Sequence, residues 1–150
     1  MGSAGTAQPY GYTEMNNLYN EYVVMGASLE FYVGENTEPV NIFVWASPNT
    51  SAPGTLDYDN LGKIPGVINL YQDTASGGNL ESPKRIRIYR GSAQVLGHEL
   101  NSLNKATFSA DPSELWYFHV VVVTSNGNNA NWAAYYKVKQ WVQLKDKKLL

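Results

Sequence analysis

Apolar and polar residues alternate along several segments of this chain, a pattern that is typical of half-buried β-strands. In segment 22–33, the odd positions from Leu29 onward are apolar, whereas the even positions carry Glu30 and Tyr32. The sequence Gly-Glu-Asn at 34–36 ends this pattern. The alternation therefore predicts a strand with one buried face and one face of polar and aromatic side chains.

Similar patterns predict further strands, at 40–46, 67–71, 84–90, 115–124 and 132–144, with weaker candidates at 94–103 and 105–108. Segment 40–46 is apolar on both sides, so we expect it either to be covered on both faces or to use one face for contact with another subunit. Four consecutive valines at 120–123 favour a central strand. Before the first strand, residues 13–19 predict a helical turn with Thr13 as its N-cap.

Cationic and aromatic side chains fall on the outward face of two of these predicted strands. Segment 84–90 directs its two isoleucines inward and Arg85 and Arg87 outward. The last strand carries four residues of this kind on one face, namely Tyr135, Lys137, Lys139 and Trp141.

Seven or so strands, long loops and almost no helix predict an all-β protein, a sandwich in which two antiparallel sheets cover each other. A length of 150 residues suits one domain. We expect residues 1–12 to form a lead-in segment and residues 13–150 to form that domain. A turn is predicted at 126–129, Asn-Gly-Asn-Asn, just before the last strand.

Composition excludes several classes of function. The chain has no cysteine, so disulfides, thiolate metal sites and cysteine nucleophiles are absent. His98 and His119 are the two histidines, and neither a Gly-x-Ser-x-Gly motif nor the spacing of a hydrolytic triad accompanies them. Two separated histidines do not supply the three or four ligands of a metal site. We therefore expect no enzymatic activity, no metal and no cofactor.

The overall charge does not favour nucleic acid, because 11 Lys and Arg against 13 Asp and Glu give a net charge of −2. No apolar run approaches the ~20 residues that cross a bilayer, so no membrane partner is expected.

The first third of the chain carries the strongest family signal. The sequence Gln-Pro-Tyr-Gly-Tyr at 8–12, the Leu-Tyr-x-x-Tyr spacing at 18–22 and the Gly-x-Ser at 26–28 occur in one continuous stretch. Together they resemble the beginning of strand C in the jelly-roll capsid proteins of circovirus-like viruses, whose Rep-encoding genomes are circular single-stranded DNA.

Later segments resemble the same family in the same order. Residues 84–97 resemble strand F and its glycine-punctuated continuation, residues 108–123 resemble the approach to strand H, and residues 133–139 resemble strand I. The resemblance extends from Gln8 to about Leu144, and it implies an antiparallel jelly-roll β-sandwich.

Two parts of the family pattern are missing. Family members carry an Arg-rich arm and then strand B before the segment that corresponds to 8–12, and residues 1–7 are too short and too rich in glycine to replace them. We therefore expect the sheet that would hold strands B, I, D and G to lack strand B, or to take it from a neighbouring chain or a further segment.

The resemblance implies a structural capsid protein that self-assembles in many copies into a small icosahedral shell around circular single-stranded DNA. It places the protein in the virion, and in the host nucleus during assembly. It also implies a host-cell attachment factor, for which no motif of this chain names a candidate.

The candidate site residues follow from this interpretation. Lys137 and Lys139 could neutralise phosphates while Tyr135 and Trp141 stack on unpaired bases, although a solvated strand face would look the same in sequence. Arg85 and Arg87 are candidates either for nucleic acid or for a salt bridge between subunits. The candidates for contact with a neighbouring subunit are Tyr10, Tyr12, Tyr19 and Trp45.

A β-sandwich carbohydrate-binding module or lectin is the competing hypothesis. It predicts a monomer with exposed, coplanar Trp or Tyr side chains on one sheet face, whereas a capsid protein predicts particles. More often, the tryptophans of such a chain fill the core of the sandwich or a contact between subunits.

Overall fold

The computed structural model describes residues 11–36, 38–51, 58–73, 84–124 and 132–148. The elements in chain order are α1 (Tyr12–Leu18), β1 (Tyr19–Asn36), β2 (Val40–Ser47), α2 (Tyr58–Gly62), β3 (Ile68–Gln72), β4 (Arg85–Gly91), α3 (Ser92–Leu96), a 3-10 turn (Ser102–Asn104), β5 (Lys105–Thr107), β6 (Tyr117–Thr124) and β7 (Trp132–Lys147). The turn predicted at 126–129 lies outside the described residues.

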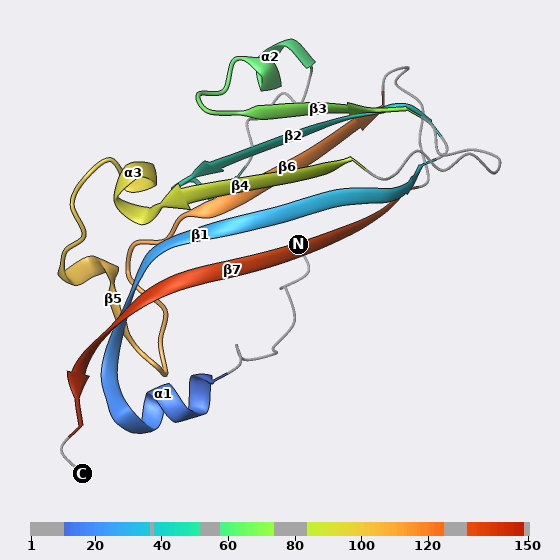
Figure 1. The fold of residues 1–150 in the computed structure, drawn as a ribbon. Helices are drawn as coiled ribbons and strands as arrows, with labels where there is room; N and C mark the ends of the chain where they lie inside the picture. Colours follow the sequence, from blue (N-terminus) through green and yellow to red (C-terminus); the bar gives the residue numbers. More distant parts are fainter. Residues whose placement is uncertain (1–10, 37, 52–57, 74–83, 125–131, 149–150) are drawn as a thin grey trace.

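The strands form two antiparallel sheets, which Figure 1 shows as two layers. In the first, called sheet A, β7 pairs with β1 along nearly its whole length, and β4 and β5 pair with different parts of β1. In the second, called sheet B, the order is β3-β2-β6. The prediction of an all-β protein made of two antiparallel sheets is confirmed.

The inner faces of the two central strands form the core. Alternation on β1 buries Leu29, Phe31 and Val33. Ile86 and Ile88 of β4 lie beside them in the same sheet, and Val40, Ile42 and Val44 of β2 pack against them from sheet B. Partly buried residues of β3, β6 and β7 pack around this cluster. The predicted inward direction of the two isoleucines in 84–90 is confirmed, and their burial fixes the outward direction of the residues between them.

A second apolar cluster covers the outer face of β2. Phe43 and Trp45 are buried there against Leu61 of α2, with Ile64 and Val67 packed beside them. The segment that follows α2 thus covers the second face of β2, which confirms one of the two alternatives expected for segment 40–46, namely cover on both faces.

The four valines of β6 also alternate between the two clusters. However, β6 lies at an edge of the described part of sheet B and is not the central strand that was predicted.

The strand predicted at 94–103 is wrong. Residues 92–96 form α3, and Gly97 ends it in the left-handed region at φ +80, where its N–H donates to the carbonyl of Ala93. Asn101 and Asn104 then form a capping box around the 3-10 turn. Local capping therefore overrides the weak strand propensity of this segment. The predicted short strand that follows is present as β5.

Two smaller expectations also change. The helical turn at 13–19 is present as α1, but its N-cap is Gly11 at φ +81 rather than Thr13. Its start at Tyr12 lies one residue before the expected domain boundary. Strand β1 is longer than predicted. It stays paired with β7 beyond the sandwich, and α1 and β5 lie at the far end of this β1–β7 pair (Figure 1).

The strand letters expected from the resemblance do not fit the pairing. By these letters β1 is strand C and β4 is strand F, and neither belongs to the sheet that holds strand I. In the structure both strands lie in one sheet with β7, the expected strand I. In the family scheme that sheet holds B, D and G. The sequence similarity of short strands does not determine which neighbours they pair with, because pairing is set by contacts between distant segments.

Truncation of the core is the first prediction. Ile88→Ala, at a side chain that is 1% exposed, should lower the free energy of unfolding by about 2–5 kcal/mol, because it removes buried methyl groups and leaves a cavity. Urea denaturation followed by circular dichroism measures the change. The matched control is Leu103→Ala, whose exposed side chain should contribute no more than about 0.5 kcal/mol. Equal losses in the two variants would contradict the assignment of the core.

Candidate nucleic-acid interface

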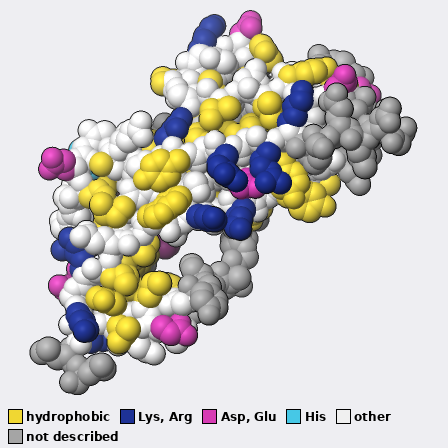
Figure 2. Space-filling view, in the orientation of Figure 1, with side chains coloured by type: hydrophobic (Ala, Val, Ile, Leu, Met, Phe, Trp, Pro, Cys, Tyr) yellow, Lys and Arg dark blue, Asp and Glu magenta, His cyan; other side chains and the backbone are white. Residues whose placement is uncertain are grey.

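The outer face of sheet A brings together all six residues that the sequence proposed for nucleic-acid contact. β4 supplies Arg85 and Arg87 along one edge of β1, and β7 supplies Tyr135, Lys137, Lys139 and Trp141 along the other. Figure 2 shows Lys and Arg side chains gathered around an acidic group on this side of the molecule. We call this surface the basic–aromatic face. The sequence assigned the residues to two strands, and the fold places those strands on either side of β1.

Glu30 lies at the centre of the cations. In the register of the sheet it is opposite Arg87 on one side and Lys137 on the other. Its Oε1 forms an ion pair with Arg85 Nη1, and its Oε2 accepts a hydrogen bond from Arg87 Nη2, each at 2.9 Å. The hydrogen bond from Arg87, together with the nearby charges of Arg85, Arg87 and Lys137, holds the pKa of this carboxyl below its usual 4.5, against the opposing effect of burial. Glu30 is therefore ionised at neutral pH.

The basic–aromatic face remains positive around this carboxylate. Four cationic side chains and one anionic side chain give it a net charge of +3, in a chain whose total charge is −2. Lys137 and Lys139 are exposed and form no ion pair within the described part of the chain. The positive charge is therefore local, as a nucleic-acid contact in an acidic protein requires.

Aromatic pairs lie at the two ends of this face. At one end, Tyr32 and Tyr135 stack with ring centroids 5.2 Å apart and planes 18° apart, and the Arg85 guanidinium lies 5.3 Å from the Tyr32 ring centroid. At the other end, Tyr89 and Trp141 meet edge to face at 5.2 Å. Tyr135, Tyr89 and Trp141 are about half exposed, so part of each ring remains accessible. Tyr135 and Trp141 lie six residue steps apart, about 20 Å along the strand.

Two glycines of β1 allow these rings to lie against the sheet. A Cβ at Gly34 would come within 2.9 Å of the Tyr135 ring, and a Cβ at Gly26 within 2.8 Å of the Tyr89 hydroxyl and 2.9 Å of the Arg90 carbonyl oxygen. Each tyrosine therefore covers the backbone of β1 at a position without a side chain.

Three residues of this face were not singled out from the sequence, namely Glu30, Tyr32 and Tyr89. Their signal was present in the alternation, because all occupy the outward positions of strands that were predicted correctly. Arg90 does not belong to the face. It extends to the loop before β3, where its guanidinium donates to the Gly66 carbonyl at 3.0 Å.

The four residues expected at a contact between subunits lie in different surroundings. Tyr10 is outside the described residues. The ring of Tyr12 packs edge to face on Phe108 of the same chain, and Tyr19 begins β1 opposite Lys147. Trp45 is wrong as a contact residue, because it is 3% exposed and packs inside its own chain.

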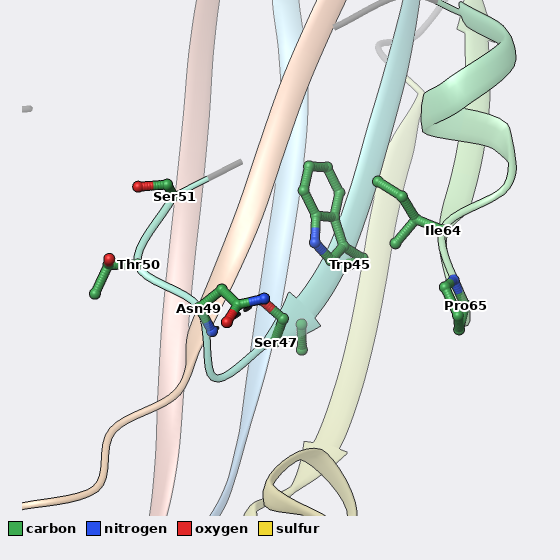
Figure 3. A pocket seen from close by; sticks show the side chains of 8 residues that line it. Trp45, Ser47, Asn49, Thr50, Ser51, Ile64 and Pro65 are labelled. Atoms are coloured by element: carbon green, nitrogen blue, oxygen red, sulfur yellow. Dashed lines mark hydrogen bonds between the residues drawn. The ribbon is translucent and has the colours of Figure 1, made fainter. Parts of the chain in front are cut away.

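A separate open hollow of about 760 Å³ lies at the end of β2 (Figure 3). It is lined by Trp45, Ala46, Ser47, Asn49, Thr50, Ser51, Ile64 and Pro65. Trp45 stacks on the ring of His119, with centroids 4.9 Å apart, and Ser47 Oγ lies 3.0 Å from His119 Nε2. Ser47 also accepts the Asn49 N–H at 3.3 Å, so this hydroxyl holds the turn after β2 to the histidine of β6.

The Ser47–His119 pair has the first two members of a hydrolytic triad, but its surroundings differ from one. A backbone hydrogen bond with Asn49 acts on His119, whereas a triad orients its histidine through a carboxylate. No group of three or more potential metal ligands occurs among the described residues. The bonds of Ser47 to Asn49 and His119 give this pair a structural part in closing the turn after β2.

Comparison with known proteins leaves the chain without an assigned family. No family model, no curated protein and no solved structure matches it. Within the described residues, no helix is both long and apolar enough to span a bilayer.

The pH dependence of stability is the second prediction. Burial disfavours the charged imidazolium and lowers the pKa of His119 below its usual 6.5, although a hydrogen bond with the Asn49 backbone acts in the opposite direction. The unfolded state therefore binds a proton at a higher pH than the folded state, and the folded state loses stability as the pH falls through 6.5 towards the lowered pKa. Above that window His119 does not make the free energy of unfolding depend on pH.

His119→Gln tests this prediction, because glutamine keeps a hydrogen-bonding group beside Ser47 but does not titrate. Chemical denaturation between pH 8 and pH 5 should show a loss of stability on acidification that is smaller in the variant. Values at pH 8 supply the baseline for each protein. Parallel pH profiles for the two proteins would show that another group is responsible.

Proposed function

We propose that this chain is a structural capsid protein, a jelly-roll subunit that self-assembles into a small icosahedral shell around circular single-stranded DNA. The proposal combines the family resemblance of the sequence with the order of the strands in the two sheets. The strand order is the observation that carries it.

A jelly roll with strands lettered B to I has one sheet in the order B-I-D-G and the other in the order C-H-E-F. The order β4-β1-β7 corresponds to G-D-I, and the order β3-β2-β6 corresponds to F-E-H. β1 is then strand D and β4 is strand G, which replaces the letters C and F expected from the sequence. Both B and C, rather than B alone, would be supplied from outside the described residues.

The two unfilled positions would lie at one side of the sandwich, beside β7 and beside β6. Tyr136 and Val138 of β7 are 60% and 47% exposed, although their partners across the β1 pairing, Phe31 and Leu29, are 6% and 3% exposed. These side chains point to the inner side of the sandwich but have little to cover them. We propose that strands B and C cover them. The resemblance places strand B before the segment that corresponds to 8–12, and the jelly-roll order places strand C before strand D, which is β1 in this scheme.

Assembly would follow from repetition of one subunit. A closed shell multiplies identical contacts, so each contact can be weak while the whole particle is stable. The exposed apolar side chains at the far end of the β1–β7 pair, Leu18 and Met25, offer surface for such contacts.

The competing lectin function has less support in the geometry. A carbohydrate platform needs exposed rings that lie in one plane, whereas Tyr89 and Trp141 are 81° apart and Tyr32 and Tyr135 stack on each other. Trp45 is buried, and Trp116 donates its indole N–H to Ser92 at 2.9 Å in a half-buried position. The accessible rings are instead interleaved with cations.

Particle formation is the third prediction. Expressed from its complete reading frame, the protein should form uniform particles in size-exclusion chromatography and negative-stain microscopy. Tyr136→Ser combined with Val138→Ser should reduce particle yield by at least about tenfold, because it removes apolar surface that strands B and C would bury. The control Leu103→Ser changes an apolar residue away from this edge whose exposure of 48% matches the 47% of Val138, and it should leave the yield unchanged.

Two results would overturn the proposal. One is a protein that stays monomeric from its complete reading frame, and a monomer that binds glycans would support the lectin instead. The other is undiminished particle yield from the Tyr136/Val138 double variant.

A further inference from the structure

The basic–aromatic face presents its charge in an arrangement that suits a flexible anionic chain. Arg85 and Arg87 share the Glu30 carboxylate from one strand, while Lys137 and Lys139 extend from the other strand without an ion-pair partner in the described residues. The cations therefore form two rows that flank β1. Phosphates spaced along a backbone can contact such rows without a fixed register.

The aromatic residues select for unpaired bases. Rings of Tyr135 at one end and of Tyr89 and Trp141 at the other are partly exposed, and Gly34 and Gly26 let two of these rings lie against the sheet. An aromatic ring can stack on any base whose face is free, whereas the bases of a duplex are stacked on one another and cannot reach it. Rings beside cations therefore favour a single strand over a duplex.

We propose that the basic–aromatic face binds single-stranded nucleic acid, with phosphates on the two rows of cations and bases on the aromatic pairs at its ends. The inference rests on the proposed function for the identity of the ligand as DNA, and it adds that this face of sheet A is directed towards the interior of the shell. Binding should depend little on base sequence, because every nucleotide has a phosphate and every base has a face on which a ring can stack.

Glu30 limits the affinity of this face. Its carboxylate takes a hydrogen bond from Arg87 and an ion pair from Arg85, and it places a negative charge at the centre of the surface that phosphates approach. A phosphate must compete with Glu30 for both arginines. Removing this one charge should therefore strengthen binding, which is a gain that a general loss of structure cannot imitate.

The fourth prediction concerns binding by the 150-residue chain. Fluorescence anisotropy should show that a labelled oligothymidylate of about 12 nucleotides binds at about 50 mM salt, and that affinity falls as salt rises. Lys137→Gln combined with Lys139→Gln should reduce the slope of log affinity against log salt by about 1.4, because two phosphate contacts are lost. Tyr135→Leu combined with Trp141→Leu should weaken binding but leave the slope unchanged.

Glu30→Gln should raise the affinity for the same oligonucleotide several-fold. The matched control is Glu14→Gln, which makes the same change of net charge on exposed α1, away from the face, and should leave the affinity within about twofold. Circular dichroism verifies that each variant is folded. If the aromatic variants lose their fold, the exposed Lys and Glu variants still test the inference.

Several outcomes would overturn the inference: no salt-dependent binding of the oligonucleotide, equal effects of Glu30→Gln and Glu14→Gln, or a preference for a duplex of the same length. Equal affinity for oligouridylate would support it, because phosphates and rings alone do not distinguish RNA from DNA. Binding with the expected dependence on Glu30, in a protein that forms no particles, would refute the proposed capsid function and retain this face as a nucleic-acid site. Particles without such binding would support the proposed capsid function and refute this inference.

Discussion

The packing of the inner face of β1 against the inner face of β2 is the interaction on which the rest of the structure depends. β1 pairs with every other strand of sheet A, and β2 pairs with every other described strand of sheet B. Burial of Leu29, Phe31 and Val33 therefore positions both layers at once. Because side chains alternate along a strand, the same burial directs Glu30 and Tyr32 outward, to the centre of the basic–aromatic face. The core and the candidate site are two consequences of one alternation.

The same alternation continues into β7 with a different result. Phe31 and Leu29 have the aliphatic side chains of sheet B opposite them, whereas Tyr136 and Val138, one strand further out, are largely exposed. An apolar inner face without cover at a sheet edge is a surface that pairs readily with a further strand. Completion of the sandwich and assembly of copies would thus begin from the same side of the molecule, while the basic–aromatic face stays free on the opposite surface of sheet A.

Much of this arrangement could be predicted from the sequence, because strand alternation is a local property. The outward direction of Arg85 and Arg87, and the common face of Tyr135, Lys137, Lys139 and Trp141, followed from a period of two residues. Two of the failed predictions show what sequence patterns do not contain. The segment 94–103 was mistaken for a strand because the left-handed Gly97 and the Asn101–Asn104 capping box act through geometry that propensity does not contain. Trp45 was mistaken for a contact residue because a segment that follows α2 covers it.

The sequence by itself determined which side chains share a face within each strand, and hence that this is a protein of two-sided sheets with a buried and an exposed side. The tertiary structure alone decided which strands are neighbours: that β4 and β7 flank β1, that Glu30 lies between two rows of cations, and that β7 has an open edge among the described residues. The physical reason is that the two properties depend on residues at different distances along the chain. The direction of a side chain depends on the dihedral angles of its own strand, whereas the choice of neighbouring strand depends on the free energy of packing among segments far apart in the chain.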